Sequence, residues 1–379
     1  MKILVSATLL FAALPLPIWT QEPPARRAGA APAPRIVSPE ISSDRHVTFR
    51  LAAPQAHEVL VTGEFMKGSK SMEKGENGVW SVTVGPIEPE IYYYNFTIDG
   101  VRTIDPNNPE VKTGSTPSTI SSTLEVHGDG PAFYDGQAVP HGEIRTHWYQ
   151  SKSLDSLRRL TVYTPPDYGR DTRTRYPVLY LLHGANADET AWYRLGHVNL
   201  ILDNLLAAGK IRPFLVVMPF GYGVPPNTPS AGGRNTEMFA KDLIEDVIPY
   251  IQSQYRALTD ADHRAIIGLS MGGGESLGIG LSHLELFGYV GGFSAAAGRP
   301  ADFAKAYAAV IANPAASNRK LHLLWLGCGR EDSLFPTDKA LADFLGEHNV
   351  KHTFLESSGA HTWINWRQYL REVAPQLFR

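Results

Sequence analysis

The sequence predicts an α/β protein with a mostly parallel sheet, preceded by a small β-sandwich domain. Residues 144–379 alternate apolar runs of strand type with helix-type runs, which is typical of a parallel sheet covered on both faces. Residues 36–126 instead show short alternating runs between turn residues, which favours a sandwich. A stretch rich in Gly, Pro and Asp, 127–143, is the expected connection between the two domains.

Composition restricts the class of protein. The 379 residues are 43% hydrophobic and 19% charged, with a formal net charge of -3 and no Lys/Arg run longer than a pair. This charge pattern predicts no nucleic-acid partner and favours neutral or weakly charged substrates. The single cysteine, Cys328, excludes an intramolecular disulfide, and its apolar surroundings indicate a buried packing residue.

The first residues have the pattern of an export signal. Lys2 precedes an apolar run over 3–16, and residues 1–20 are therefore interpreted as a signal peptide. The run is too short to span a bilayer comfortably, so no membrane span is expected in the mature chain, although an uncleaved anchor is the alternative. Residues 21–35 form a Pro/Ala-rich linker. We expect a secreted or periplasmic bacterial protein.

The strands expected in 36–126 place their apolar residues on alternate positions. Tyr92, Tyr94 and Phe96 fall on one face, which predicts a sandwich core, whereas Tyr93 falls on the other face and is the candidate for an exposed sugar-stacking platform. Asp99 and Gly100 then form a strong hairpin-turn dipeptide. The further alternating residues are Val47, Phe49, Leu51, Trp80, Val82, Val84 and Ile98.

In 144–379 the apolar runs predict the elements of the sheet and its covering helices. The expected strands are 160–163, 178–182, 214–218, 265–267 and 321–326, and the expected helices are 200–208 and 239–255.

The strand at 265–267 enters a Gly-x-Ser-x-Gly motif at 268–272 with Ser270 at its centre. This is the nucleophile-elbow pattern, in which glycines allow a sharp strand-to-helix turn that exposes the serine hydroxyl. An acyl-transfer serine also needs a histidine, a carboxylate and backbone donors for the oxyanion.

The acid and the histidine follow in the order of α/β-hydrolases. Asp332 lies just beyond the strand at 321–326, where active-site groups of open α/β sheets belong, and His361 lies in a loop of small residues before a final helix. Glu331 is the rival acid. Singly, His361 could be a surface histidine and either carboxylate a helix cap, but their joint order favours a triad.

Two backbone N–H groups are expected to form the oxyanion hole. Met271 follows the nucleophile, and Ala185 follows the His183–Gly184 pair at the end of the strand 178–182. His183 is interpreted as a hydrogen-bonding residue that orders this loop, not as a second base. No metal or organic cofactor is implied.

Aromatic residues after two strand ends are candidates for substrate contact. Trp192 follows the oxyanion loop and Tyr222 follows the strand at 214–218, where both could line an acyl pocket. The alternative is that they are packing residues. His141, in the connecting segment, is interpreted as structural.

Several motifs occur together in 140–379. They are 140–142 (Pro-His-Gly), 162–168, 176–184 (ending in His-Gly), 268–273 and 359–367 (Gly-Ala-His-Thr-Trp-Ile-Asn-Trp-Arg). With these motifs, 140–379 resembles carbohydrate esterase family 1, which contains feruloyl and acetylxylan esterases. The resemblance implies an α/β-hydrolase fold with Ser270 as nucleophile, Asp332 as orienting acid and His361 as general base. Asn186 stands where many relatives have glycine, and asparagine tolerates the same left-handed backbone.

A second set of motifs lies in 36–126. It consists of 63–65 (Gly-Glu-Phe), 78–80 (Gly-Val-Trp), 92–96, 99–100 and 105–107 (Asp-Pro-Asn). With these motifs, 36–126 resembles the immunoglobulin-like N-terminal domain of glycogen-branching enzymes and of some esterases, which is related to carbohydrate-binding module family 48. Glycan-binding members usually have a tryptophan where this chain has Met66–Gly68.

These resemblances imply a serine esterase that removes feruloyl groups from xylan-type polysaccharides or oligosaccharides through an acyl-enzyme. The alternatives are an acetylxylan esterase, a siderophore esterase of the enterochelin type, and a glycan-binding protein with an inactive hydrolase domain. The expected partner is a feruloylated or acetylated plant polysaccharide.

Overall fold

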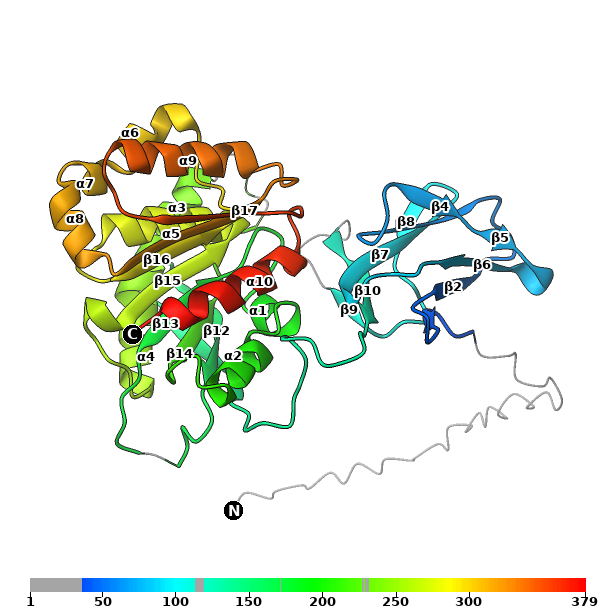
Figure 1. Cartoon of the computed structure of the whole chain (residues 1–379), viewed down its shortest axis with the longest axis horizontal. Coiled ribbons are helices and arrows are strands. Elements are labelled where there is room, and N and C mark those ends of the chain that lie inside the picture. The colour runs from blue at the N-terminus through cyan, green and yellow to red at the C-terminus, as the bar shows by residue number, and fades with distance from the viewer. Residues whose placement is uncertain (1–35, 113–118, 171, 227, 229–231) are drawn as a thin grey trace, which may run out of the picture. The chain divides into compact units, whose positions relative to one another are not determined.

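The computed structural model describes residues 36–379 apart from 113–118, 171, 227 and 229–231 (Figure 1). The expected signal peptide and the Pro/Ala-rich linker lie outside the described residues. Residues Val37–Arg379 form one compact unit. In this part of the chain, none of the helices is long and apolar enough to cross a membrane.

Residues 40–126 form two antiparallel sheets. The first has the order β1 (Glu40–Ile41), β2 (Val47–Ala52), β6 (Val79–Val84) and β5 (Glu73–Lys74). The second has the order β4 (Ser69–Ser71), β3 (Val59–Gly63), β7 (Glu90–Ile98), β10 (Ser121–Val126) and β9 (Val111–Lys112), with β8 (Val101–Thr103) paired to β7. A single 3-10 turn, Glu76–Gly78, precedes β6.

The alternation seen in the sequence builds one core between these two sheets. Phe49 from the first sheet and Tyr94 from the second lie with ring centroids 4.7 Å apart, in a buried cluster that draws residues from both sheets. Asp99 and Gly100 have φ values of 45° and 85°, so both turn residues are left-handed, as the predicted hairpin requires. Trp80 is buried and its indole N–H donates to the Ala53 carbonyl, which makes it a core residue.

The expectation that Tyr93 forms an exposed platform is wrong. Tyr93 points away from the core between the two sheets, as predicted, but it is only 6% exposed. It shares a hydrophobic cluster with Ile91 and with Trp363 and Trp366 from the C-terminal part of the chain. The second face of β7 therefore packs against residues 144–379 instead of facing solvent.

The third sheet has eight strands. Their order is β11 (Glu143–Ser151), β12 (Ser156–Thr164), β14 (Leu215–Pro219), β13 (Val178–Leu182), β15 (Arg264–Leu269), β16 (Tyr289–Phe293), β17 (Leu323–Gly329) and β18 (Thr353–Ser357). The β11–β12 and β12–β14 pairings are antiparallel and the others are parallel. A mostly parallel sheet was predicted.

Helices cover both faces of this sheet (Figure 1). One face carries α3 (Gly232–Lys241), α4 (Ile248–Gln254), α5 (Ser270–Ser282) and α9 (Phe335–Glu347), and the other carries α1 (Ala191–Arg194), α2 (Val198–Ala207) and α10 (Trp363–Val373). The shorter elements are α6 (Phe303–Ala306), α7 (Ala308–Ile311), α8 (Pro314–Lys320) and the turns Ala261–His263, Pro300–Asp302 and Ala374–Gln376.

The helix predicted over 239–255 begins earlier and is not continuous. A π-helical segment, Asp242–Val247, separates α3 from α4. Pro249 lies in the first turn of α4 and has no N–H with which to continue an α-helical ladder across this point.

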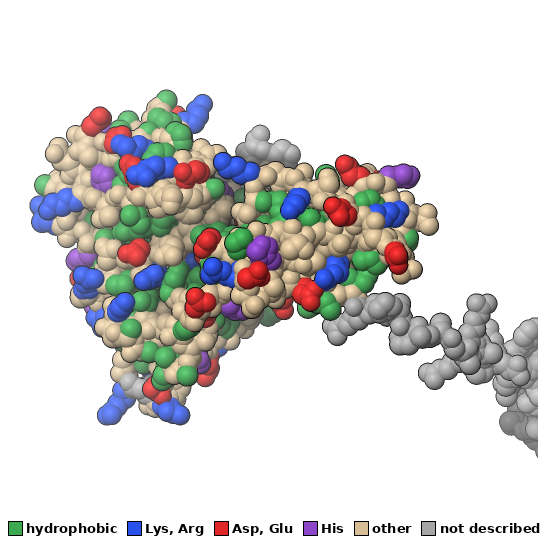
Figure 2. Space-filling view, turned by 45° about the vertical axis from the view of Figure 1, so that its right-hand side comes forward, with side chains coloured by type: hydrophobic (Ala, Val, Ile, Leu, Met, Phe, Trp, Pro, Cys, Tyr) green, Lys and Arg blue, Asp and Glu red, His purple; other side chains and the backbone are tan. Residues whose placement is uncertain are grey.

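Charged side chains of both signs are interspersed on the face shown in Figure 2. This distribution agrees with the small net charge and with the absence of basic runs in the sequence.

Candidate active site

Ser270 stands at a strained turn between β15 and α5. Its φ is 53°, whereas Leu269 before it is extended. A side chain at Gly268 would collide with the Gly272 carbonyl, and one at Gly272 would collide with the His183 carbonyl. Glycine is therefore required at both positions for the chain to turn so tightly.

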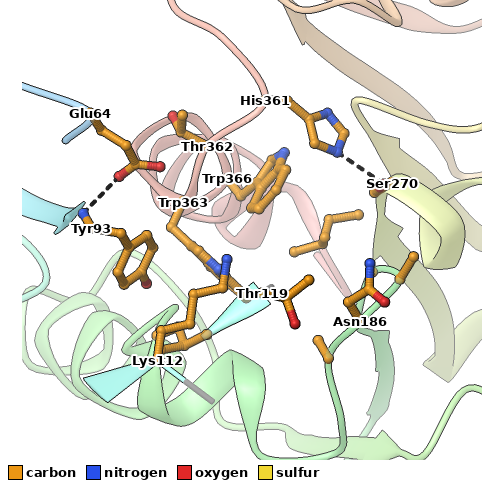
Figure 3. A pocket seen from close by; sticks show the side chains of 15 residues that line it. Glu64, Tyr93, Lys112, Thr119, Asn186, Ser270, His361, Thr362, Trp363 and Trp366 are labelled. Carbon is orange, nitrogen blue, oxygen red and sulfur yellow. Dashed lines mark hydrogen bonds between the residues drawn. The ribbon is translucent and has the colours of Figure 1, made fainter. Parts of the chain in front are cut away.

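His361 lies between Ser270 and Asp332. Its Nε2 is 2.9 Å from the Ser270 Oγ (Figure 3). Its Nδ1 is 2.8 Å from the Asp332 Oδ2. An ionised carboxylate only accepts hydrogen bonds, so Nδ1 carries the proton and the Nε2 of the neutral ring is free to accept from the serine. This is the arrangement that a general base needs to deprotonate a nucleophile.

Asp332 is held as a carboxylate. Burial alone would raise its pKa, but hydrogen bonds from His361, from the Leu334 N–H and from Ser294 outweigh that effect, and the pKa is lowered. The rival Glu331 does not reach the imidazole. Its carboxylate accepts the Gly359 N–H instead, which ties it to the loop that carries His361.

The loop before α10 is fixed from several sides. The Asn365 amide donates to the Ser358 carbonyl at 2.7 Å, and Gly359 has a φ of 96° that a side chain would strain. The ring of Trp366 meets the His361 ring edge to face, with centroids 4.9 Å apart. These contacts restrict the imidazole to the position between the serine and the aspartate.

The two predicted oxyanion donors lie beside the serine. Ala185 lines the same cavity as Ser270, and Met271 is the second residue of α5, in the helical turn whose N–H groups have no intrahelical acceptor. Asn186 has a φ of 61°, the left-handed geometry expected of it, and its N–H donates to the Tyr222 hydroxyl at 2.7 Å.

A cavity of about 170 Å³ opens next to Ser270 (Figure 3). Trp363 and Trp366 project into it from α10, one helical turn apart. Its walls come both from the part of the chain that forms the two N-terminal sheets and from the part that forms the eight-stranded sheet. The lining residues are Glu64, Tyr93, Lys112, Thr119, Gly184, Ala185, Asn186, Ala187, Leu195, Leu269, Ser270, His361, Thr362, Trp363 and Trp366.

The two predicted substrate contacts do not line this cavity. Trp192 is 1% exposed, and its indole N–H donates to the Leu182 carbonyl at 2.9 Å, so it is a packing residue behind the site. Tyr222 acts on the site indirectly, because its hydroxyl accepts the Asn186 N–H and thereby holds the loop at 184–187. Both aromatic residues follow strand ends, but neither is among the residues that line the cavity at Ser270.

The other histidines singled out in the sequence have structural contacts. The buried His183 accepts the Gly221 N–H on Nε2, and burial lowers its pKa, so the ring is neutral. It orders the loop, as expected. His141 pairs with the buried Asp203, which also accepts the Tyr163 hydroxyl. Cys328 is buried, and burial raises the pKa of its thiol.

Among the described residues, one group has the spacing of metal ligands. It consists of Glu125, His127 and Asp135, and none of these lines the cavity at Ser270.

Comparison with known proteins shows to which family the chain is similar. The Esterase family matches residues 151–377. An endo-1,4-beta-xylanase/feruloyl esterase of Xylanibacter ruminicola is 35% identical over 90% of this chain and 46% of its own length. Esterase Rv1288 of Mycobacterium tuberculosis is 36% identical over 33% of this chain and 27% of its own. The chain thus spans less than half the length of these two curated relatives.

Solved structures with a similar fold include two esterases. A ferulic acid esterase of Anaeromyces mucronatus is 25% identical, with a TM-score of 0.57 over 66% of this chain and 96% of that one. The enterochelin esterase of Shigella flexneri is 19% identical, with a TM-score of 0.66 over 90% of this chain and 94% of that one. The match of the family model to 151–377, more than half of the chain, shows that the chain belongs to the Esterase family.

Proposed function

We propose that the chain is an α/β-hydrolase-fold serine esterase that removes feruloyl or related hydroxycinnamoyl groups from xylan-type polysaccharides or oligosaccharides. The observation that carries this proposal is the position of His361 between Ser270 and Asp332, at 2.9 and 2.8 Å, beside an aromatic-lined cavity. The Xylanibacter ruminicola relative, whose name includes a feruloyl esterase, supports the choice of acyl group.

In the proposed mechanism His361 takes the Ser270 proton as the alkoxide attacks the ester carbonyl. The N–H groups of Ala185 and Met271 stabilise the oxyanion, and the protonated His361 then donates to the leaving alcohol. Water, deprotonated by the same imidazole, hydrolyses the acyl-enzyme and restores the serine. Asp332 keeps the ring in the tautomer that both half-reactions use.

The size of the cavity favours an aromatic acyl group over acetyl. A dry engineered cavity of about 150 Å³ holds one benzene molecule, and the cavity here measures about 170 Å³. One ring-sized group fits it, whereas an acetyl group would leave most of the apolar wall at Trp363 and Trp366 without contact.

The proposal is tested with methyl ferulate and acetylated xylan as parallel substrates. The wild type should hydrolyse methyl ferulate with the higher kcat/KM, and Ser270→Ala should lower that rate by at least about a thousandfold. A wild type that acts only on acetylated xylan would replace the feruloyl assignment with acetylxylan esterase. Activity retained by Ser270→Ala would refute the serine mechanism.

We also propose export of the chain, which rests on the apolar run at 3–16 after Lys2. N-terminal sequencing of the protein recovered from expressing bacteria tests it, because export predicts a mature chain that begins after about residue 20. Recovery of the full-length chain from the cytoplasm would contradict export.

A further inference from the structure

Part of the cavity wall comes from the two N-terminal sheets and their loops, residues 40–126, which we call the β-region. Glu64 follows β3, Tyr93 lies on β7 and Lys112 ends β9, and all three line the cavity that contains Ser270 (Figure 3). We propose that Glu64 and Lys112 form the subsite for the phenolic hydroxyl of the acyl group. This inference rests on the proposed function and assigns acyl recognition to a region that looks, in sequence, like a separate carbohydrate-binding module.

The β-region is held firmly against the catalytic part of the chain. Arg367 of α10 is completely buried, and its guanidinium binds the Glu90 carboxylate at 2.5 Å and the Leu195 carbonyl at 2.8 Å. Ile91 and Tyr93, next to Glu90 on β7, pack in one cluster with Trp363 and Trp366. The strand that carries Tyr93 is therefore fixed to the helix that directly follows His361.

Lys112 places an ammonium group in this cavity. Its Nζ lies 4.9 Å from the centre of the Tyr93 ring, and the side chain is half-buried. Among the described residues, no carboxylate lies within ion-pair distance of this Nζ and no oxygen accepts a hydrogen bond from it. Burial lowers the pKa of Lys112, and the nearby Glu64 opposes that shift. A partly desolvated ammonium to which the described residues offer the Tyr93 ring face but no oxygen favours a ligand oxygen.

Glu64 supplies the complementary acceptor. One of its carboxylate oxygens accepts the Tyr93 N–H at 3.0 Å, which fixes the side chain, while the residue remains open to the cavity. Desolvation by the surrounding protein raises the pKa of the Glu64 carboxyl, whereas the hydrogen bond from the Tyr93 N–H and the positive charge of Lys112 lower it. A phenolic hydroxyl both accepts and donates one hydrogen bond, so it can accept from the ammonium of Lys112 and donate to the carboxylate of Glu64.

The cavity also fixes the orientation of the acyl group. The ester carbonyl must reach Ser270 at one end, and the two tryptophans provide an apolar wall for the ring. The polar pair then meets the end of the ring farthest from the ester, which carries the hydroxyl in 4-hydroxycinnamoyl esters. An acyl group without that hydroxyl would cover this end of the cavity without giving the Lys112 ammonium an oxygen acceptor or the Glu64 carboxylate a further donor.

The experiment compares methyl 4-coumarate with methyl cinnamate, which differ only in the ring hydroxyl. The readout is the ratio of the two kcat/KM values. The wild type should favour the coumarate, and this ratio should fall by about tenfold or more in Lys112→Met, because a hydrogen bond to a charged group contributes about 1.5–3 kcal/mol. Glu64→Gln should lower the ratio as well, and it serves as the second variant if Lys112→Met folds poorly.

Lys70→Met is the matched control, since Lys70 lies on the same β-region, is exposed and does not line the cavity. It should leave the ratio unchanged. An unchanged ratio in both Lys112→Met and Glu64→Gln would overturn the subsite while leaving the esterase proposal intact. A loss confined to feruloylated arabinose oligosaccharides would also overturn it, because the pair would then contact the sugar. A wild type inactive on both methyl ferulate and methyl 4-coumarate would overturn the proposed function together with the subsite.

Discussion

At the scale of single residues, two carboxylates that are adjacent in the chain make different contacts. Asp332 contacts the His361 imidazole, whereas Glu331 accepts the backbone N–H of Gly359 in the same loop. Both side chains position His361, one by fixing its tautomer and the other by fixing its loop. Only the first is expected to affect the chemical step strongly.

Asp332→Asn should lower kcat for methyl ferulate by about 10⁴-fold, as removal of the charged partner does in serine-protease triads, because the amide favours the wrong imidazole tautomer. Glu331→Gln keeps an oxygen that can accept the Gly359 N–H and should lower kcat by less than about tenfold. Steady-state kinetics of the two variants gives the comparison. An equal loss in both would mean that the triad acid is not assigned correctly.

A second carboxyl group behind the site predicts a pH dependence of stability. Burial raises the pKa of Asp338 to about 7, although the Ala295 N–H and the Cys328 thiol oppose the shift. Between about pH 4 and 7 the folded protein thus keeps a proton that the unfolded chain releases, so the free energy of unfolding falls as pH rises through this window.

Asp338→Asn retains an acceptor for the Ala295 N–H but does not titrate. The free energy of unfolding of the wild type, relative to this variant, should therefore decrease by up to about 4 kcal/mol between pH 4 and pH 8, at 1.36 kcal/mol per pKa unit. Urea unfolding at the two pH values measures the difference. A constant difference would show that Asp338 has an ordinary pKa.

The candidate catalytic residues could be selected from the sequence because the proposed chemistry demands a fixed order and fixed places. Ser270, Asp332 and His361 each follow a strand end, and the structure brings all three together. The substrate contacts were not accessible in the same way. Trp192 and Tyr222 also follow strand ends, but position in the chain does not determine where a side chain points. No sequence pattern indicated Lys112. It ends the short strand β9 in a different sheet, and nothing in the sequence shows that this strand end lies near Ser270.

At the scale of elements, α5 depends on glycines at its N-terminus for close approach to the sheet. Gly272 lies against Leu182 and His183 at the end of β13, so that an added methyl group would meet backbone atoms. Gly278, two turns later on the same helix, has only the Thr236 methyl near it, at 3.9 Å. The two glycines lie in the same helix but differ in how closely neighbouring atoms approach the position of an added methyl group.

Gly272→Ala should therefore destabilise the protein by about 1–3 kcal/mol, as overpacking does, and it should lower activity because it displaces the loop that carries Ala185. Gly278→Ala should be neutral or stabilise the protein by up to about 1 kcal/mol through helix propensity. Thermal unfolding and methyl ferulate turnover of both variants test this. Similar destabilisation by the two substitutions would contradict the packing argument.

The elements that the sequence predicted well are those with continuous burial. The strand expected at 178–182 coincides with β13, which is buried at every position. The strands β11, β16 and β18 were not predicted. β11 and β18 lie at the sheet edges, where burial is incomplete and the apolar pattern is weak. β16 contains Gly291 and Gly292, which lower its strand propensity even though it is buried.

At the scale of the whole molecule, a buried ion pair joins the β-region to α10, the helix that follows His361. Arg367 is fully buried and Glu90 is 8% exposed, so removal of either charge leaves the other without compensation. No sequence pattern indicates this pair, because its two members lie 277 residues apart in the chain. The expected division into a sandwich and a hydrolase domain therefore missed the surface that they share.

Glu90→Gln should lower the free energy of unfolding by about 3 kcal/mol, the cost of leaving a buried charge unpaired. Asp343→Asn is the control, because its pair with Lys339 is exposed and should contribute no more than about 0.5 kcal/mol. Urea denaturation at neutral pH compares the two. If Glu90→Gln is no more destabilising than the control, the β-region does not depend on this contact.

The proposed mechanism requires that Ser270 carries a hydroxycinnamoyl group during turnover. Rapid acid quenching of the wild type during methyl ferulate hydrolysis, followed by peptide mass spectrometry, tests it directly. We predict a mass increase of one feruloyl group on the peptide that contains Ser270, and no such adduct in Ser270→Ala. Turnover with an adduct on another residue, or adduct formation that persists in Ser270→Ala, would contradict the mechanism.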